Sequence, residues 1–127
     1  MATTPTYANG KICYLEIPAV DVKVSADFYQ KCFGWKIRSD NYGHTSFDDT
    51  INEVSGMWVS GTLPMKEPGI IISIMVDDAS ATSLLIANHG GEIVKELVMS
   101  SGEKIVHFRD PAGNFFGLYQ GNDRERG

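Results

Sequence analysis

The sequence predicts an α+β fold: two tandem βαβββ modules form a curved eight-stranded mixed sheet around a cleft, with the helices outside. The first observation is a repeat. Asp21 and Gly34 bracket one helical segment, and Asp78 and Gly91 bracket a second one 57 residues further along. The second observation is that strand-like and helix-like hydrophobic patterns follow in the same order in both halves. Two copies of a unit that cannot bury its apolar face alone predict a paired architecture with a concave space between them.

The first module spans about residues 11–60. Its first strand ends at Pro18, which lacks the amide needed to continue a ladder. Asp21 can accept hydrogen bonds from the free amides of the next turn, and the helix that follows places its apolar side chains on one face. Gly34 suits the left-handed residue that closes a helix. The predicted elements are a strand at 12–18, a helix at 22–33, and strands at 35–39, 44–49 and 54–60.

The second module spans about residues 70–119, after a proline-containing connector at 61–69. The turn at 110–114 is expected to be structural, because Pro fixes φ and Gly or Asn accepts a positive φ. A polar tail at 120–127 is expected to fray. The predicted elements are a strand at 70–76, a helix from the Asp78 cap to His89, and strands at 92–99, 104–109 and 115–119. We expect all of residues 1–127 to form a single domain.

Composition excludes several classes of function. The net charge of −5 leaves no basic stripe to neutralise phosphates, so we expect no nucleic-acid partner. No apolar run is long enough to span a membrane, and the first residues lack a signal pattern, so we expect a cytoplasmic protein without a membrane partner. Cys13 and Cys32 are too few for a disulfide framework and lack metal-ligand spacing.

Four segments carry a resemblance to a known family. They are residues 14–21, 28–35, 69–91 and 108–118, the last containing Asp-Pro-x-Gly-Asn followed by Phe-Phe-Gly-Leu. In this order and spacing the chain resembles the vicinal oxygen chelate superfamily, which includes glyoxalase I, bleomycin resistance proteins and extradiol dioxygenases. The resemblance implies the paired-module fold, and relatives of this size are commonly homodimers. It does not imply one activity, because one fold hosts many chemistries.

The resemblance also implies where a metal would bind. Metal-dependent members carry ligands on the first and last strand of each module, and the equivalent positions are Tyr14, Ser60, Ile71 and Gly117. None of these is His, Asp, Glu or Cys, the side chains that hold divalent transition metals. We therefore predict no metal cofactor. A divalent metal at a relocated site is the alternative, with ligands from Glu16, His107 and perhaps His44.

Glu16 and His107 are the candidate catalytic residues. A carboxylate within an apolar strand costs free energy unless it is paired or solvated, and partial burial would suit it to acid or base work. The alternative for Glu16 is an ion pair with Arg38 or Arg109, or plain exposure. His107 can exchange a proton near neutral pH, or it can be a structural histidine.

The candidate ligand-binding residues are expected to share the concave face. Tyr14, Trp58 and Phe115 would provide an aromatic lining, although they could equally be core, and the small side chain of Ser60 would leave room. With Glu16 and His107 they complete the predicted site. Period-two geometry sends Tyr14 and Glu16 to the same side of their strand.

Three functions remain open on the sequence alone. The first is a metal-free protein that binds a small hydrophobic or aromatic molecule in the cleft. The second is a lyase or isomerase of the glyoxalase type with Glu16 or His107 as acid or base, so whether the chain is an enzyme is undecided. The third is a protein-interaction module. A small-molecule ligand and a homodimer are the expected partners, and the modules could pair within one chain or across the dimer.

Overall fold

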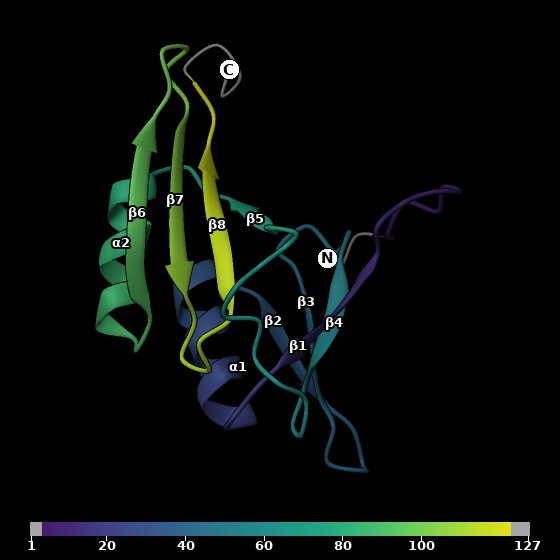
Figure 1. Ribbon diagram of the computed structural model, residues 1–127. Coiled ribbons are helices and arrows are strands. Elements are labelled where there is room, and N and C mark those ends of the chain that lie inside the picture. Colours follow the sequence, from purple (N-terminus) through teal and green to yellow (C-terminus); the bar gives the residue numbers. More distant parts are fainter. Residues whose placement is uncertain (1–3, 123–127) are drawn as a thin grey trace.

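The computed structural model describes residues 4–122, so residues 123–127 of the predicted polar tail lie outside the described part. Module one contains four strands and one helix in the predicted order (Figure 1). Its elements are β1 (Tyr14–Pro18), α1 (Val22–Phe33), β2 (Lys36–Ser39), β3 (Thr45–Asp48) and β4 (Ser55–Val59).

Module two repeats this order and confirms the tandem βαβββ prediction. Its elements are β5 (Ser73–Met75), α2 (Ala79–Asn88), β6 (Glu92–Val98), β7 (Lys104–Arg109) and β8 (Phe115–Gln120). The first strand of this module is shorter than predicted, and the other boundaries of the module differ from the prediction by at most one residue.

The eight strands form two separate four-stranded sheets, where the sequence predicted one continuous sheet of eight. Sheet one has the order β1-β4-β3-β2 and sheet two the order β5-β8-β7-β6. In each sheet the first and last strands of the module pair in parallel and the remaining pairs are antiparallel. The α+β fold class is confirmed. Because β1 and β5 stand at the sheet edges, each keeps one row of backbone groups unpaired within these sheets.

The two helices begin as the sequence predicted. Asp21 caps α1 by accepting hydrogen bonds from the amides of Lys23 and Val24, and Asp78 caps α2 through the amide of Ala81. Gly34 follows α1 with a φ of 73°, the left-handed conformation expected of a closing glycine. No helix within residues 4–122 has the length and apolar character needed to cross a membrane.

The helix-facing sides of the two sheets pack into one hydrophobic core. Tyr29 of α1 shows this most directly, because its ring lies 5.8 Å from the ring of Trp58 on β4 and 5.9 Å from that of Phe116 on β8. Phe28 of α1 also reaches Phe108 of β7, with ring centroids 6.2 Å apart. One helix therefore contacts the inner face of both sheets. The outer faces must point away from this shared core, and so away from each other.

The turn at 110–114 carries a buried carboxylate that joins the modules. Asp110 is 3% exposed and accepts hydrogen bonds from the Tyr29 hydroxyl, from the amides of Ala112, Gly113 and Asn114, and from the Asn114 side chain. Burial raises the pKa of Asp110, and these hydrogen bonds partly offset the rise. The turn is therefore structural, as predicted, and it links module two to α1.

Asn114 extends this connection to the rest of the chain. Its side-chain nitrogen donates to the carbonyl of Pro18 at the end of β1, and its side-chain oxygen accepts from the amide of Met65 in the connector. The amide of Phe115 donates to the Met65 carbonyl as well. Since Asn114 is almost fully buried, these bonds are shielded from water, and they fix the relative position of the two modules.

The repeat of 57 residues does not continue into the last strand of each module. Glu16 pairs with Met57 in sheet one, and Ser73, which is 57 residues after Glu16, pairs with Gly117 in sheet two. Gly117 therefore corresponds to Met57 and not to Ser60. The shift arises because the segments between helix and last strand differ in length, so an offset measured at the helix caps does not apply beyond them.

Candidate functional site

The first group of predicted site residues lies on β1, on the outer face of sheet one. Tyr14 is 48% exposed and Glu16 is also exposed, whereas Leu15 and Ile17 between and after them are turned toward the core. This alternation is the period-two geometry that the sequence predicted for Tyr14 and Glu16. Met57 of β4 lies beside Glu16 in the pairing register, so an apolar side chain flanks the carboxylate.

Glu16 makes no ion pair with the arginines that were the alternative to a site role. Arg38 instead binds Asp48 through two contacts of 2.9 and 3.0 Å, and Arg109 binds Glu92 at 3.1 Å. The predicted ion-pair alternative for Glu16 is therefore wrong, and the remaining alternative, an exposed carboxylate, describes its position. Because water solvates this carboxylate, its presence in the strand costs little free energy.

The second group lies on the outer face of sheet two. His107 of β7 is directly opposite Gly117 of β8, and its ring contacts Phe115 with centroids 5.2 Å apart. A methyl group built on Gly117 would lie 2.7 Å from the Ser73 hydroxyl, 3.5 Å from Ile71 and 3.6 Å from His107. Because Gly117 has no side chain, the Ser73 hydroxyl, the His107 imidazole and the Ile71 side chain can all come close to its backbone. Of the predicted ligand-binding residues, the structure brings His107 and Phe115 together.

Trp58 and Ser60 do not share the outer face with these residues. Trp58 is 2% exposed and packs in the core against Tyr29 and Phe47. Ser60 lies beyond the end of β4 and is exposed. The expectation that Trp58 lines the site with Tyr14 is wrong, and its alternative as a core residue is the one observed, because the expectation used the repeat of 57 where the pairing register differs. The residue at the equivalent position is Met57, which only the strand register reveals.

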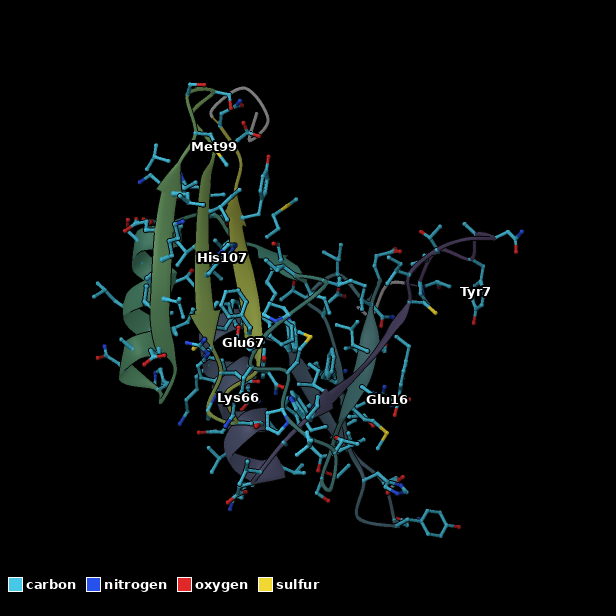
Figure 2. All side chains as sticks on the ribbon, viewed as in Figure 1. Tyr7, Glu16, Lys66, Glu67, Met99 and His107 are labelled. Atoms are coloured by element: carbon cyan, nitrogen blue, oxygen red, sulfur yellow. The ribbon has the colours of Figure 1, made fainter. Side chains whose placement is uncertain are left out.

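The two groups remain separate within one chain. Figure 2 shows Glu16 on β1 and His107 on β7, in different sheets and well apart. This follows from the shared core, because inner faces that pack together turn the outer faces away from each other. The expected single cleft containing Glu16 and His107 is therefore not formed by the described part of one chain. Each sheet carries half of the predicted site.

The positions that hold a metal in metal-dependent relatives do not fit one here. Ile71 and Gly117 come close together, as ligands would, but a hydrocarbon side chain and a missing one offer no lone pair. The relocated alternative also fails within one chain, because His44 is bound to Asp40 on an exposed loop and residues 4–122 contain no group of three or more His, Cys, Asp or Glu side chains suited to a metal ion. A metal-free state remains a prediction.

Comparison with known proteins agrees with this architecture. A curated relative, a glyoxylase-like domain-containing protein from Didymella fabae, is 31% identical over 116 residues, which is 84% of this chain and 90% of that protein. Among solved structures, the fosfomycin resistance protein FosX from Listeria monocytogenes has a TM-score of 0.76 at 15% identity, covering 94% of this chain and 97% of that one.

A glyoxalase/bleomycin resistance protein/dioxygenase superfamily member from Sphaerobacter thermophilus has a TM-score of 0.71 at 20% identity, covering 88% of this chain and 98% of that one. The similarity to these two solved structures establishes the fold of this chain. The family model named Glyoxalase/Bleomycin resistance protein/Dioxygenase superfamily matches residues 11–118. With nearly the whole chain matched and the paired βαβββ modules in place, the chain belongs to the Glyoxalase/Bleomycin resistance protein/Dioxygenase superfamily.

Proposed function

We propose that this chain is a metal-free protein that binds a small hydrophobic or aromatic molecule, and that a second copy of the chain completes its site. One observation carries the proposal: each sheet presents half of the predicted site on an outer face beside an edge strand. Tyr14 and Glu16 lie on the edge strand β1, and His107 lies near Ile71 and Ser73 at the edge strand β5.

The chemistry of the two halves supports an amphipathic ligand. Tyr14, Ile71 and Phe115 offer aromatic and aliphatic surface for an apolar body. Glu16 can accept a hydrogen bond from a hydroxyl or amine, and His107 can donate or accept one. An apolar surface with a few convergent polar groups is the usual character of a small-molecule site.

The free sheet edges support a homodimer. An edge strand with unpaired amides and carbonyls is a template for pairing with another chain. β1 and β5 carry such edges, and exposed apolar side chains stand beside them, including Met75 at 79% exposure. If β1 of one copy pairs with β5 of another, the strands join into sheets of eight. The outer faces of β1 and of the partner's second module would then border one cleft.

The side chains at the expected ligand positions support the metal-free part of the proposal. Tyr14, Ser60, Ile71 and Gly117 together supply one phenol oxygen and one hydroxyl, and Met57 in the place of Ser60 would supply a thioether, so neither set offers the imidazole, carboxylate or thiolate groups that hold a divalent transition metal. Binding in this site would therefore rest on apolar contact and on the hydrogen bonds of Glu16 and His107. A glyoxalase-type lyase or isomerase with Glu16 or His107 as acid or base is the alternative, and a reaction that used both residues would require the second copy.

The test is complementation between two defective chains, with 2-naphthol as the probe. Glu16→Ala and His107→Ala chains, each with a different affinity tag, are co-expressed, and the mixed dimer is purified. Calorimetric titration measures the number of sites for 2-naphthol in the wild type, in each single variant and in the mixed dimer. Analytical ultracentrifugation of each sample measures its mass against the 14.0 kDa of one chain.

We expect each single variant to lose most of its affinity. The mixed dimer should regain wild-type affinity at half the number of sites, because one of its two clefts has both native residues. A mixed dimer that binds no better than the single variants would show that the two residues do not act together across chains. A monomeric wild-type protein, or one whose binding survives both substitutions, would overturn the proposal. A stoichiometric transition metal in the purified protein would overturn its metal-free part.

A further inference from the structure

A cavity of about 690 Å³ lies between the two modules, lined from module two mainly by residues 72–78. Its volume falls within the range of roughly 300–1,000 Å³ typical of small-molecule sites. Residues from both modules line it, and they are mostly apolar. The lining residues used below are Leu15, Trp35, Phe47, Asp49, Ile74, Asp77, Asp78 and Phe116.

This cavity is distinct from the site proposed above. Leu15 lines it, whereas the adjacent Tyr14 and Glu16 belong to the outer face of the same strand. In the same way Phe116 lines it, whereas Phe115 contacts His107 on the other face of β8. The two sites meet at Ser73, which lines the cavity and whose hydroxyl also lies beside Gly117, opposite His107.

Aromatic rings pack beneath one side of the cavity. The rings of Trp35 and Phe47 are stacked with centroids 4.4 Å apart and an interplanar angle of 13°, and Phe33 packs next to Trp35 with centroids 5.9 Å apart. Ile74 and Phe116 contribute apolar surface from module two. Trp35, Phe47 and Phe116 are almost fully buried, so these rings lie beneath the cavity as apolar packing and leave little ring face for a ligand.

The charged groups of the lining all have one sign. Asp49, Asp77 and Asp78 line the cavity, and none of its lining residues is Lys, Arg or His. Asp49 accepts a hydrogen bond from the amide of Glu53 through one of its carboxylate oxygens. Asp77 is exposed and carries no hydrogen bond or ion pair with the described residues, so its carboxylate can meet a ligand cation at low cost.

The N-terminus of α2 also lies at the cavity and would by itself attract an anion. Its amides are already engaged, however: the amide of Ala81 donates to Asp78, and the amide of Ala79 donates to the Gln120 side chain. The capping carboxylate of Asp78 also neutralises the positive end of the helix. The local field in the cavity is therefore negative.

From these observations we propose that the cavity between the modules is a second binding site, for an organic cation with an aromatic or aliphatic body. The body lies against the partly buried side chains of Leu15 and Ile74, and the ammonium group lies toward Asp49 and Asp77. This site needs no second copy of the chain and neither Glu16 nor His107.

Three probes with one aromatic body and different charge test the proposal. They are 1-naphthylmethylammonium, 1-naphthalenemethanol and 1-naphthoate, titrated by calorimetry at low ionic strength. We expect the ammonium to bind about three- to tenfold more tightly than the neutral alcohol, the range for one or two partly exposed ion pairs, and the carboxylate to bind most weakly. Asp49→Asn with Asp77→Asn should abolish the preference for the ammonium, because the amides keep the shape but remove the charge.

Two further variants locate the binding. Ile74→Trp should fill the cavity and weaken binding of all three probes, and Tyr42→Phe, at an exposed residue outside the lining of the cavity, should change none of them. Equal affinity for the ammonium and the alcohol, or a preference that survives the double Asp variant, would overturn the cationic assignment. Binding that responds to Tyr42→Phe and not to the cavity variants would overturn the site. These outcomes are independent of the complementation test, which changes only outer-face residues.

Discussion

Two carboxylates show how the inner and outer faces of the sheets differ. Asp110 lies on the inner side, almost fully buried, with five hydrogen bonds that tie its turn to α1. Glu16 lies on the outer side, exposed and free of ion pairs with the described residues. A buried carboxylate is tolerated only when its oxygens are satisfied, whereas an exposed one is solvated by water and stays available to a ligand. The side chains of the inner face therefore stabilise the fold, whereas those of the outer face are available to bind a ligand.

Removing the buried carboxylate should have the largest effect. Asp110→Ala leaves the Tyr29 hydroxyl, three backbone amides and the Asn114 side chain without their acceptor. We expect the free energy of unfolding to fall by about 4 kcal/mol, measured by urea denaturation followed by circular dichroism. The control is Asp77→Ala, an exposed carboxylate without hydrogen bonds, which should change it by less than about 0.5 kcal/mol. A loss at Asp110 as small as that of the control would remove the distinction between the faces.

A methyl group added to the inner face should have the next largest effect. A Cβ on Gly56 of β4 would lie 2.2 Å from the Leu15 carbonyl oxygen and 2.5 Å from the ring of Phe47. Neither the backbone nor the packed ring can move freely, so Gly56→Ala should cost about 2–3 kcal/mol. The matched control is Gly69→Ala in the connector, where nothing lies within 4 Å. The measurement is the midpoint of thermal unfolding. An equal decrease for Gly56→Ala and Gly69→Ala would contradict the tight packing assigned to the inner face at Gly56.

Removal of one hydroxyl tests the link between modules. Tyr29→Phe keeps the ring that packs between Trp58 and Phe116 but deletes the 2.8 Å hydrogen bond to Asp110. We expect a loss of about 1–1.5 kcal/mol in the free energy of unfolding. Tyr42→Phe, on an exposed residue, should be neutral by the same denaturation assay. An equal effect at both positions would mean that the buried hydrogen bond adds nothing.

The outer-face carboxylate should have the smallest effect on stability. Glu16→Gln preserves the size of the side chain and removes its charge, and no ion pair is lost in the described chain. We expect the free energy of unfolding to stay within about 0.5 kcal/mol of the wild type. Affinity for 2-naphthol should fall in the same variant, as measured by calorimetry. A large loss of stability would instead make Glu16 part of the structural framework.

The fold was accessible from the sequence because local signals determine it. The Asp21 and Asp78 caps, the closing Gly34 and the alternating strands each act over a few residues, and all of them occur in the structure where they were predicted. The structural role of the turn at 110–114 was accessible for the same reason. Helix caps and turns depend on the side chains and allowed φ values of a few neighbouring residues, and these can be read from a short stretch of sequence.

The arrangement of the candidate site was only partly accessible, because it depends on register and on the packing of the modules. Trp58 was placed on the wrong face because a repeat measured at the helices was extended to a strand where the pairing shifts. A change of one residue in register reverses the face of every side chain. The separation of Glu16 from His107 depends on which sides of the sheets share a core, and no local pattern encodes that choice.

Crosslinking between two different chains tests most directly whether the two half-sites meet across copies. One chain carries Glu16→Cys and the other His107→Cys, with Cys13, which is exposed, replaced by Ser in both. Cys32 can remain, since burial raises the pKa of its thiol to about 11 and keeps it unreactive. The two chains are co-expressed and treated with a short bismaleimide. We predict a covalent heterodimer of twice the 14.0 kDa chain mass. Chains that stay uncrosslinked in a folded sample would contradict a cleft shared between two copies.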